Sequence, residues 1–358
     1  MIKKIIFSLI FFILLVFCLL QLQFVQNQLA DYTIRSQIFN TLIENPNMPT
    51  EDTLSALICG SRSPVVASTE RAETCTMIIA GNDLFIIDVG DGSVNNLRNW
   101  GVPFDQIKAV FITHLHSDHI SDLADLHLMT WVSKLPDKKS KLYVYGPLGI
   151  DAVTAGFELS HKLDYIYRNR HHGDEIMPLN NAGYISKVFN EGNVLKFSDS
   201  ELEVRPFTVM HSPVEPSFGL RFDYKGRSVV ISGDTIPNDN VIKFASNADI
   251  LIHEAQSNYL VDLARDELDR NDSFLSKIMS DIKTYHTTPK DAARVAKKAE
   301  VSHLILNHLS PAPDSYVAKK FFSRGLKDIF EDWTIAEDGM MISLPVGNKE
   351  INFSKFNR

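Results

Sequence analysis

Apolar and polar positions alternate in short blocks along most of the chain, and these blocks predict strands and helices in turn. In the first half, "TMIIAGNDLFIIDVG" is typical of two strands joined by a turn at "GND", and "IKAVFITH" is typical of one short apolar strand. A further strand is expected at 140–147. Helical spacing favours helices at 93–101, 121–134 and 149–170, the first ending at Gly101 and the last at Arg170.

The second half of the chain repeats this alternation. Strands are predicted at 202–211, 248–255, 302–310 and 333–344, and helices at 288–300 and 314–330. Residues 218–235 predict a hairpin that turns at Lys225 and Gly226. Two comparable halves of this kind predict an α/β fold in which two sheets pack face to face with helices outside, a four-layer sandwich.

The N-terminus departs from this pattern. Lys3 and Lys4 precede an almost unbroken apolar run from Ile5 to Leu20, which is the layout of an export signal. Apolar residues beyond Leu20 extend the run to the ~20 residues that a bilayer requires. We expect an uncleaved signal-anchor helix, with a cleaved signal peptide and a buried soluble helix as the alternatives.

The predicted organisation has three parts: a signal anchor or signal peptide at 1–27, a polar stalk with a short helix at 28–52, and a catalytic domain at 53–358. Basic residues that flank an apolar segment tend to stay in the cytoplasm. The domain is therefore expected to be exported, on the periplasmic or extracellular side, and anchored in the inner membrane by the N-terminal helix.

Composition and charge narrow the function classes. Of 358 residues, 44% are hydrophobic and 22% are charged, as is usual for a globular protein. The formal net charge is -8 and no Lys/Arg-rich block stands out, which argues against capture of nucleic acid by a broad basic face. One local basic cluster could hold an anionic substrate or could be a solvated helix end; it comprises Arg168, Arg170, His171 and His172.

The three cysteines leave one question open. Cys18 lies in the N-terminal apolar run, whereas Cys59 and Cys75 lie in neighbouring strand-like segments. An exported protein can keep a disulfide, and pairing across a hairpin would contribute about 3 kcal/mol through loop closure. Two buried free thiols are the equal alternative.

Histidines and aspartates gather just beyond the C-terminal ends of apolar strands. The motif "THLHSDH" contains three histidines and an aspartate within six positions, 114–119. His211, Asp234 and His308 follow the apolar runs "FTVM", "VVISG" and "LILN". Short loops at strand ends often hold ligands, because the backbone there is fixed and the side chains converge. The pattern predicts a metal site.

The spacing of these residues favours two ions. Alternate residues of H-x-H-x-D-H can reach one ion from an extended backbone, and the following turn can reach a second. We expect the first ion to be bound by His114, His116 and His211, the second by Asp118, His119 and His308, and both to be bridged by Asp234. Imidazole and carboxylate ligands suit zinc foremost, and also iron or manganese. The predicted cofactors are two divalent metal ions.

Taken in order, "DVGDGS", "THLHSDH", "ISGDT", "LIHEA" and "LNHLS" resemble the metallo-β-lactamase superfamily over residues 54–344. The resemblance implies an αβ/βα sandwich with a dinuclear site between its sheets. It also implies that Asp88 is a structural aspartate that braces the metal loop and is not a ligand.

Within that superfamily, residues 232–311 resemble ribonuclease Z. The resemblance implies that His286 assists the leaving group and that Glu254 orients it, and a carboxylate that holds an imidazole in one tautomer makes a competent acid. A surface histidine and a buried structural carboxylate are the plainer interpretations of these two residues.

Other segments, at 57–79 and 145–173, are similar to exported arylsulfatases of the metallo-β-lactamase type. Ribonuclease Z carries a Gly- and Lys-rich arm that grips tRNA. The matching region here has no such insertion, so nucleic acid is not the favoured partner.

The function expected from the sequence is an exported two-metal hydrolase of a small anionic substrate. It would cleave a sulfate ester or a phosphodiester with a hydroxide between the ions, and its catalytic residues would be Asp118, His286 and Glu254. A ribonuclease Z-type endoribonuclease is the alternative; a membrane-tethered binding module without activity, and lactone or lactam hydrolysis, come after it. A homodimer is expected by analogy with relatives. The remaining histidines that we expect to be structural are His127, His161, His253 and His303.

Overall fold

The computed structural model describes residues 2–42, 48–49, 51–65, 70–138, 140–197 and 201–356. The chain divides into two units, Met1–Met48 and Pro49–Arg358. Parts of the predicted stalk, at 43–47 and 50, lie outside the described residues.

The first unit consists of two helices, α1 (Ile2–Leu20) and α2 (Gln23–Leu42). The backbone turns between them, where the Gln21 N–H donates to the Cys18 carbonyl at 3.1 Å, and the two axes differ by 78°. Neither of these helices, nor any other in the described part of the chain, is by itself long and apolar enough to cross a membrane; the bent pair satisfies that test only together. The helix expected at 1–27 is therefore interrupted at Leu20.

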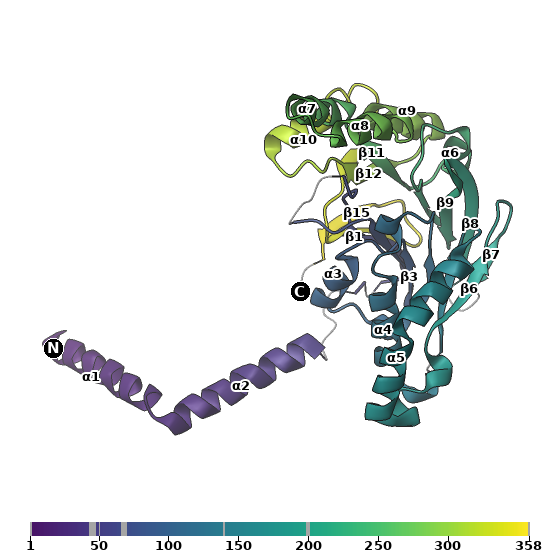
Figure 1. The fold of residues 1–358 in the computed structure, drawn as a ribbon. Helices are drawn as coiled ribbons and strands as arrows, with labels where there is room; N and C mark the ends of the chain where they lie inside the picture. Colours follow the sequence, from purple (N-terminus) through teal and green to yellow (C-terminus); the bar gives the residue numbers. More distant parts are fainter. Residues whose placement is uncertain are drawn as a thin grey trace. The chain divides into compact units, whose positions relative to one another are not determined.

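The second unit is built on two sheets (Figure 1). The first has the strand order β15-β14-β1-β2-β3-β4-β5-β6. Its strands are β1 (Thr53–Gly60), β2 (Cys75–Ala80), β3 (Asp83–Ile87), β4 (Ile107–Phe111), β5 (Leu142–Gly146), β6 (Tyr184–Val188), β14 (Met340–Pro345) and β15 (Asn352–Lys355).

The second sheet has the strand order β13-β12-β11-β10-β9-β8-β7. Its strands are β7 (Leu195–Phe197), β8 (Leu202–His211), β9 (Val214–Tyr224), β10 (Arg227–Ile231), β11 (Ile250–Gln256), β12 (His303–Ser310) and β13 (Trp333–Ile335). The predicted hairpin is confirmed, since Tyr224 pairs with Arg227 and the turn residues Lys225 and Gly226 have φ angles of 44° and 83°.

The main core lies between the two sheets. Every residue of β1 is buried, because side chains on both faces of this strand are covered. Phe111 of the first sheet lies 6.3 Å from Phe85, centroid to centroid, and 5.9 Å from Phe222 of the second sheet. These contacts join the sheets face to face, as the apolar runs predict.

Helices cover the outer faces and complete the four layers (Figure 1). The first sheet is covered by α3 (Ser93–Asn99), α4 (Leu123–Ser133) and α5 (Ile150–Ile176). The second is covered by α6 (Asp239–Phe244), α9 (Pro289–Ala299) and α10 (Tyr316–Phe322). The helices α7 (Asn258–Arg270) and α8 (Leu275–Asp281) pack on each other. The fold is the predicted α/β sandwich.

The helix expected to end at Arg170 is regular as far as His172 and is broken at Gly173 (φ 76°, ψ 169°), after which one short turn reaches Ile176. Two predicted boundaries are wrong. The helix expected at 314–330 spans only α10, and the chain turns at Gly325, where φ is 77°. The strand expected at 333–344 is two strands in different sheets, β13 and β14, with a turn at Gly339, where φ is 85°.

Cys59 and Cys75 form a disulfide between the adjacent strands β1 and β2, with their Cα atoms 4.9 Å apart. Both residues are fully buried. Of the two alternatives left open by the sequence, the structure contains the disulfide. The loop that it closes contains Arg62 and Ser63.

Candidate metal centre

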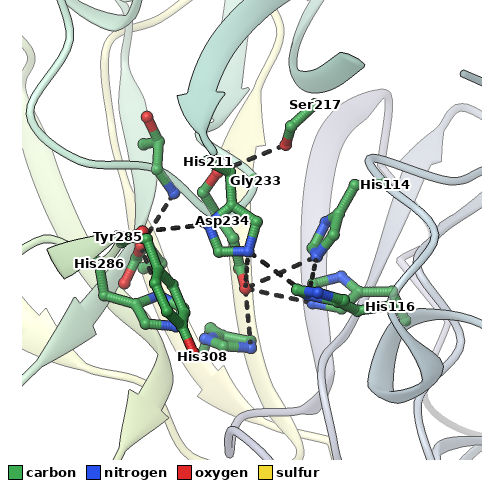
Figure 2. A network of polar contacts seen from close by, with 12 residues as sticks. His114, His116, His211, Ser217, Gly233, Asp234, Tyr285, His286 and His308 are labelled. Atoms are coloured by element: carbon green, nitrogen blue, oxygen red, sulfur yellow. Dashed lines mark hydrogen bonds and ion pairs between the residues drawn. The ribbon is translucent and has the colours of Figure 1, made fainter. Parts of the chain in front are cut away.

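The seven predicted metal-binding side chains converge where strands of the two sheets end, and Figure 2 shows five of them. One group follows β4 of the first sheet and the other belongs to the second sheet, at the end of β8, just after β10 and within β12. In chain order they are His114, His116, Asp118, His119, His211, Asp234 and His308.

Three imidazoles form the first expected ligand group. Nε2 of His114 lies 3.0 Å from Nδ1 of His116, and Nε2 of His211 lies 3.4 Å from the same atom. Nδ1 of His211 donates to the Tyr285 carbonyl at 3.0 Å, which leaves its Nε2 facing the cluster. Burial lowers the pKa of all three histidines, so each imidazole is neutral and has a lone pair for a cation.

The second group lies beside the first and shares an aspartate with it. Oδ2 of Asp118 lies 3.1 Å from Nε2 of His308 and 3.4 Å from Nε2 of His119. Oδ2 of Asp234 lies 3.3 Å from the same nitrogen of His308, 3.5 Å from that of His119, and 3.9 Å from that of His211. Asp234 therefore contacts both groups, as a bridging ligand must.

The donor set fits divalent cations. Among the described residues, the buried atoms His119 Nε2, Asp234 Oδ1 and His308 Nδ1 have no hydrogen-bond partner, which is costly unless another ligand satisfies them. Burial alone raises the pKa of a carboxyl, yet the surrounding imidazoles hold the pKa of Asp118 and Asp234 well below its usual range. Ionised carboxylates enclosed with imidazoles are the donors that zinc and similar metals prefer.

Asp88 holds the metal loop in place. Its Oδ1 accepts from the Thr113 N–H at 2.8 Å, and its Oδ2 accepts from the Thr113 hydroxyl at 2.8 Å and from Nδ1 of His119 at 2.9 Å. This last bond fixes the tautomer of His119 and turns its Nε2 toward the ligand group. The contacts are those of a structural aspartate, which is the role implied by the family resemblance.

An irregularity in β12 places His308. Along the pairing with β11, Glu254 lies opposite Asn307 and Ala255 lies opposite Leu309, so His308 is an extra residue. Its φ angle is 45°, in the left-handed region that few non-glycine residues adopt. Such a bulge re-aims a side chain, and here it directs the imidazole into the cluster.

His286 and Glu254 form a hydrogen-bonded pair beside the cluster. Nδ1 of His286 donates to Oε1 of Glu254 at 2.9 Å, and the Thr235 N–H donates to the same oxygen at 2.9 Å. Burial alone lowers the pKa of His286, but the Glu254 carboxylate, with Asp234 and Asp118, raises it to about 9. Both side chains are buried, so His286 is not the surface histidine of the plainer interpretation.

Comparison with known proteins identifies the family of this chain. The family described as anti-Pycsar protein Apyc1 matches residues 58–308. Ribonuclease Z of Mycolicibacterium gilvum is 32% identical over 258 residues, which cover 72% of this chain and 85% of that protein. The chain belongs to the ribonuclease Z and Apyc1 family of the metallo-β-lactamase superfamily.

Solved structures agree on the fold. The metallo-β-lactamase fold protein YhfI from Bacillus subtilis has a TM-score of 0.57 at 20% identity, over 82% of this chain and 100% of that one. The short form of human tRNase Z has a TM-score of 0.56 at 24% identity, over 81% and 99%. The superfamily and the ribonuclease Z-like group suspected from the sequence are confirmed.

Each of the four histidines that we expected to be structural has a hydrogen-bonding partner of its own. Nε2 of His127 accepts from the Gly183 N–H at 2.7 Å, and His303 contacts the Thr334 hydroxyl at 2.9 Å. His161 contacts the Phe157 carbonyl at 3.0 Å, and Nδ1 of His253 donates to the Glu254 carbonyl at 2.8 Å.

The basic cluster near the end of α5 is remote from the centre. The described residues that line the cavity next to the metal centre do not include Arg168, Arg170, His171 or His172. Arg168 instead donates to Asp164 at 2.8 Å, one turn earlier on the same helix. This placement favours the solvated helix end over the substrate-binding alternative.

A cavity of about 860 Å³ opens onto the metal centre. His116, Asp118, Asp234, His286 and His308 line one side of it. The other lining residues were not found from the sequence; they include Ser63, Tyr285 and a set of apolar side chains on α7 and α8.

One of these missed features, helix α7, carried a signal in the sequence. Ser257 caps α7 by accepting from the Leu260 N–H at 3.4 Å, and apolar residues follow at helical spacing, which predicts a helix. No comparable signal marks Ser63, which is 2% exposed and whose hydroxyl has no hydrogen-bond partner among the described residues.

Proposed function

We propose that this protein is a metal-dependent phosphodiesterase of the ribonuclease Z type. The observation that carries the proposal is the shared buried ligand set, centred on Asp234, with the His286–Glu254 pair directly beside it. Hydrolysis of a phosphodiester with a poor leaving group uses both parts, since one stabilises charge on the phosphoryl group and the other protonates the departing oxygen.

Each residue has a distinct task in this proposal. His114, His116 and His211 hold one cation, Asp118, His119 and His308 hold the other, and Asp234 joins the two groups. Divalent ions bound there supply Lewis acidity at a phosphoryl oxygen and activate water for attack near neutral pH. His286 donates the proton on Nε2 to the leaving oxygen, because Glu254 accepts from Nδ1 and keeps the imidazole in the orientation required.

Support for the type of bond comes from the relatives. The curated relative named above is a ribonuclease, and ribonucleases cleave phosphodiesters. The sulfate ester, which was expected first from the sequence, has no support among the relatives named here. We therefore place phosphodiester hydrolysis ahead of it.

Parallel assays test this order. Purified protein is assayed on bis-p-nitrophenyl phosphate and on p-nitrophenyl sulfate, with and without a chelator, and with metal content measured on the same samples. We expect chelator-sensitive turnover of the phosphodiester and none of the sulfate ester. Turnover of the sulfate ester alone would overturn the proposal.

RNA processing is the second candidate function. The identity to ribonuclease Z favours it. The segment between β5 and β6, where ribonuclease Z would carry its Gly- and Lys-rich arm, consists largely of α5, which is broken only at Gly173. Precursor tRNA as a third substrate in the same assays decides the point: cleavage of tRNA with no turnover of small diesters would favour RNA processing.

We also propose that the protein is exported and held at a membrane by its N-terminal helices. The buried disulfide supports this proposal, since disulfides persist in oxidising compartments and are rare in the cytosol. Limited proteolysis of intact cells, with and without permeabilisation, tests it. Cleavage of the chain only after the inner membrane is opened would refute export.

A further inference from the structure

The cavity has two chemically different sides. One side is the metal centre and His286, and the other is apolar. This apolar wall is formed by Leu268 of α7, by Leu275, Ile278 and Met279 of α8, and by Ile282. We call these five residues the α7–α8 wall. Val65 lies near it.

The α7–α8 wall is supported by a small core of its own. Val261, Met279 and Ile282 are buried together, and Val65, Leu268 and other partly buried side chains pack against them. This cluster is separate from the clusters between and outside the sheets. The wall is thus a stable surface and not a loose loop.

Part of the wall faces solvent in this structure. Leu275 is 41% exposed and Ile278 is 46% exposed, although both line the cavity. Apolar side chains exposed together at a cavity indicate a binding site for apolar groups, because a ligand that covers them removes apolar surface from water.

The charge of the lining argues in the same direction. Among the described residues that line the cavity there is no Lys or Arg, and the one charged residue on the wall side is Glu267. A polyanion that extended across this side would meet an acidic and apolar surface without a cation to pair its charges. The phosphoryl group belongs at the metal centre, and the remainder of the substrate must suit the wall.

From this arrangement we infer that the α7–α8 wall binds an apolar ester group of the phosphodiester substrate and thereby selects it. The inference rests on the proposed function and names its substrate class: diesters in which one substituent is an alkyl or other apolar group. A cavity of about 860 Å³ lies within the ~300–1,000 Å³ usual for small-ligand sites, and it has room for such a substituent.

The test uses a series of alkyl p-nitrophenyl phosphates, from methyl to hexyl, which share one leaving group. Burial of each added CH₂ raises kcat/KM by about 4-fold when it is complete. With the partial burial expected of a flexible chain, we expect the hexyl ester to exceed the methyl ester by about 100-fold in the wild-type protein.

The matched variants are Ile278→Asn and Ile176→Asn. Ile278 is 46% exposed on the wall and Ile176 is 48% exposed at the end of α5, so both substitutions change an isoleucine of similar exposure. We expect Ile278→Asn to reduce the hexyl-to-methyl ratio about 10-fold, and Ile176→Asn to leave the ratio unchanged.

The outcomes separate the two proposals. Turnover of the methyl ester without any gain toward hexyl would overturn the wall and leave the phosphodiesterase intact. If no diester is turned over, the phosphodiesterase fails, and calorimetric titration with methylphosphonate and hexylphosphonate then decides the wall alone: equal affinities would overturn it, and tighter binding of hexylphosphonate would support it. Thermal melts confirm that each variant is folded.

Discussion

The Glu254→Gln substitution tests the proposed proton transfer while it preserves the shape of the site. Glutamine can still accept at Oε1 from the Thr235 N–H and from Nδ1 of His286, both of which lie 2.9 Å from that oxygen. What it removes is the negative charge that stabilises the protonated imidazole. A hydrogen bond to a charged group contributes about 1.5–3 kcal/mol and a neutral one about 0.5–1.5 kcal/mol, so loss of the charge alone costs about 1–1.5 kcal/mol, or about 5–13-fold in rate.

The loss should depend on the leaving group. p-Nitrophenolate departs without a proton, so on p-nitrophenyl diesters we expect Glu254→Gln to lose less than ~2-fold in kcat/KM. On diesters whose leaving group is phenol or an alcohol, the loss should reach the full ~5–13-fold, and His286→Asn should lose ~10²–10⁴-fold. Plotted against the pKa of the leaving phenol, log(kcat/KM) should fall more steeply in both variants than in the wild-type protein.

A surface histidine on α5 supplies the control. His172→Asn, at an exposed position, should leave the slope of that plot unchanged. Parallel lines for the wild-type protein and Glu254→Gln would refute the reasoning, because a purely structural glutamate would lower all rates equally. In that case another group must protonate the leaving oxygen.

Three further predictions concern the metals, the disulfide and a buried acid. Asp234→Ala should lose bound metal and turnover together, since both ligand groups contact this side chain; survival of both after dialysis would contradict the assignment. The double substitution Cys59→Ser and Cys75→Ser should lower the free energy of unfolding in urea by about 3 kcal/mol, and reductant should mimic it in the wild-type protein. Burial raises the pKa of Asp122 from 3.8 to about 6, so the folded state disfavours the ionised form and stability falls as pH rises across that interval. Asp122→Asn should remove this fall, which melting curves at pH 4 and pH 7 would detect.

The convergence of the candidate ligands could be predicted from the sequence because its signals are local. The spacing of His114, His116, Asp118 and His119 within one loop does not depend on the rest of the chain, and apolar runs mark the strand ends that carry the other ligands. The two-sheet sandwich followed from the alternation of strands and helices. The disulfide could not be decided in this way, because burial of two neighbouring thiols and their pairing leave the same pattern.

Other features depended on contacts between distant residues. The segment 333–344 is continuous in its apolar pattern, yet Leu304 pairs with Trp333 in one sheet and Leu57 pairs with Met341 in the other. Periodicity describes the burial of a strand and does not say which sheet it joins. The core under the α7–α8 wall likewise requires Val65, almost 200 positions before Val261, so its existence was not evident from either segment.

The position of the α7–α8 wall along the chain has an evolutionary consequence. Residues 258–282 form one continuous segment between Glu254 and His286, and none of the expected metal ligands lies within it. Mutations there can alter which molecules enter while the machinery for bond cleavage stays as it is. A duplicated gene could therefore acquire a new substrate by drift within some twenty-five codons, and a combinatorial library confined to that stretch is the natural place to redirect this enzyme in the laboratory.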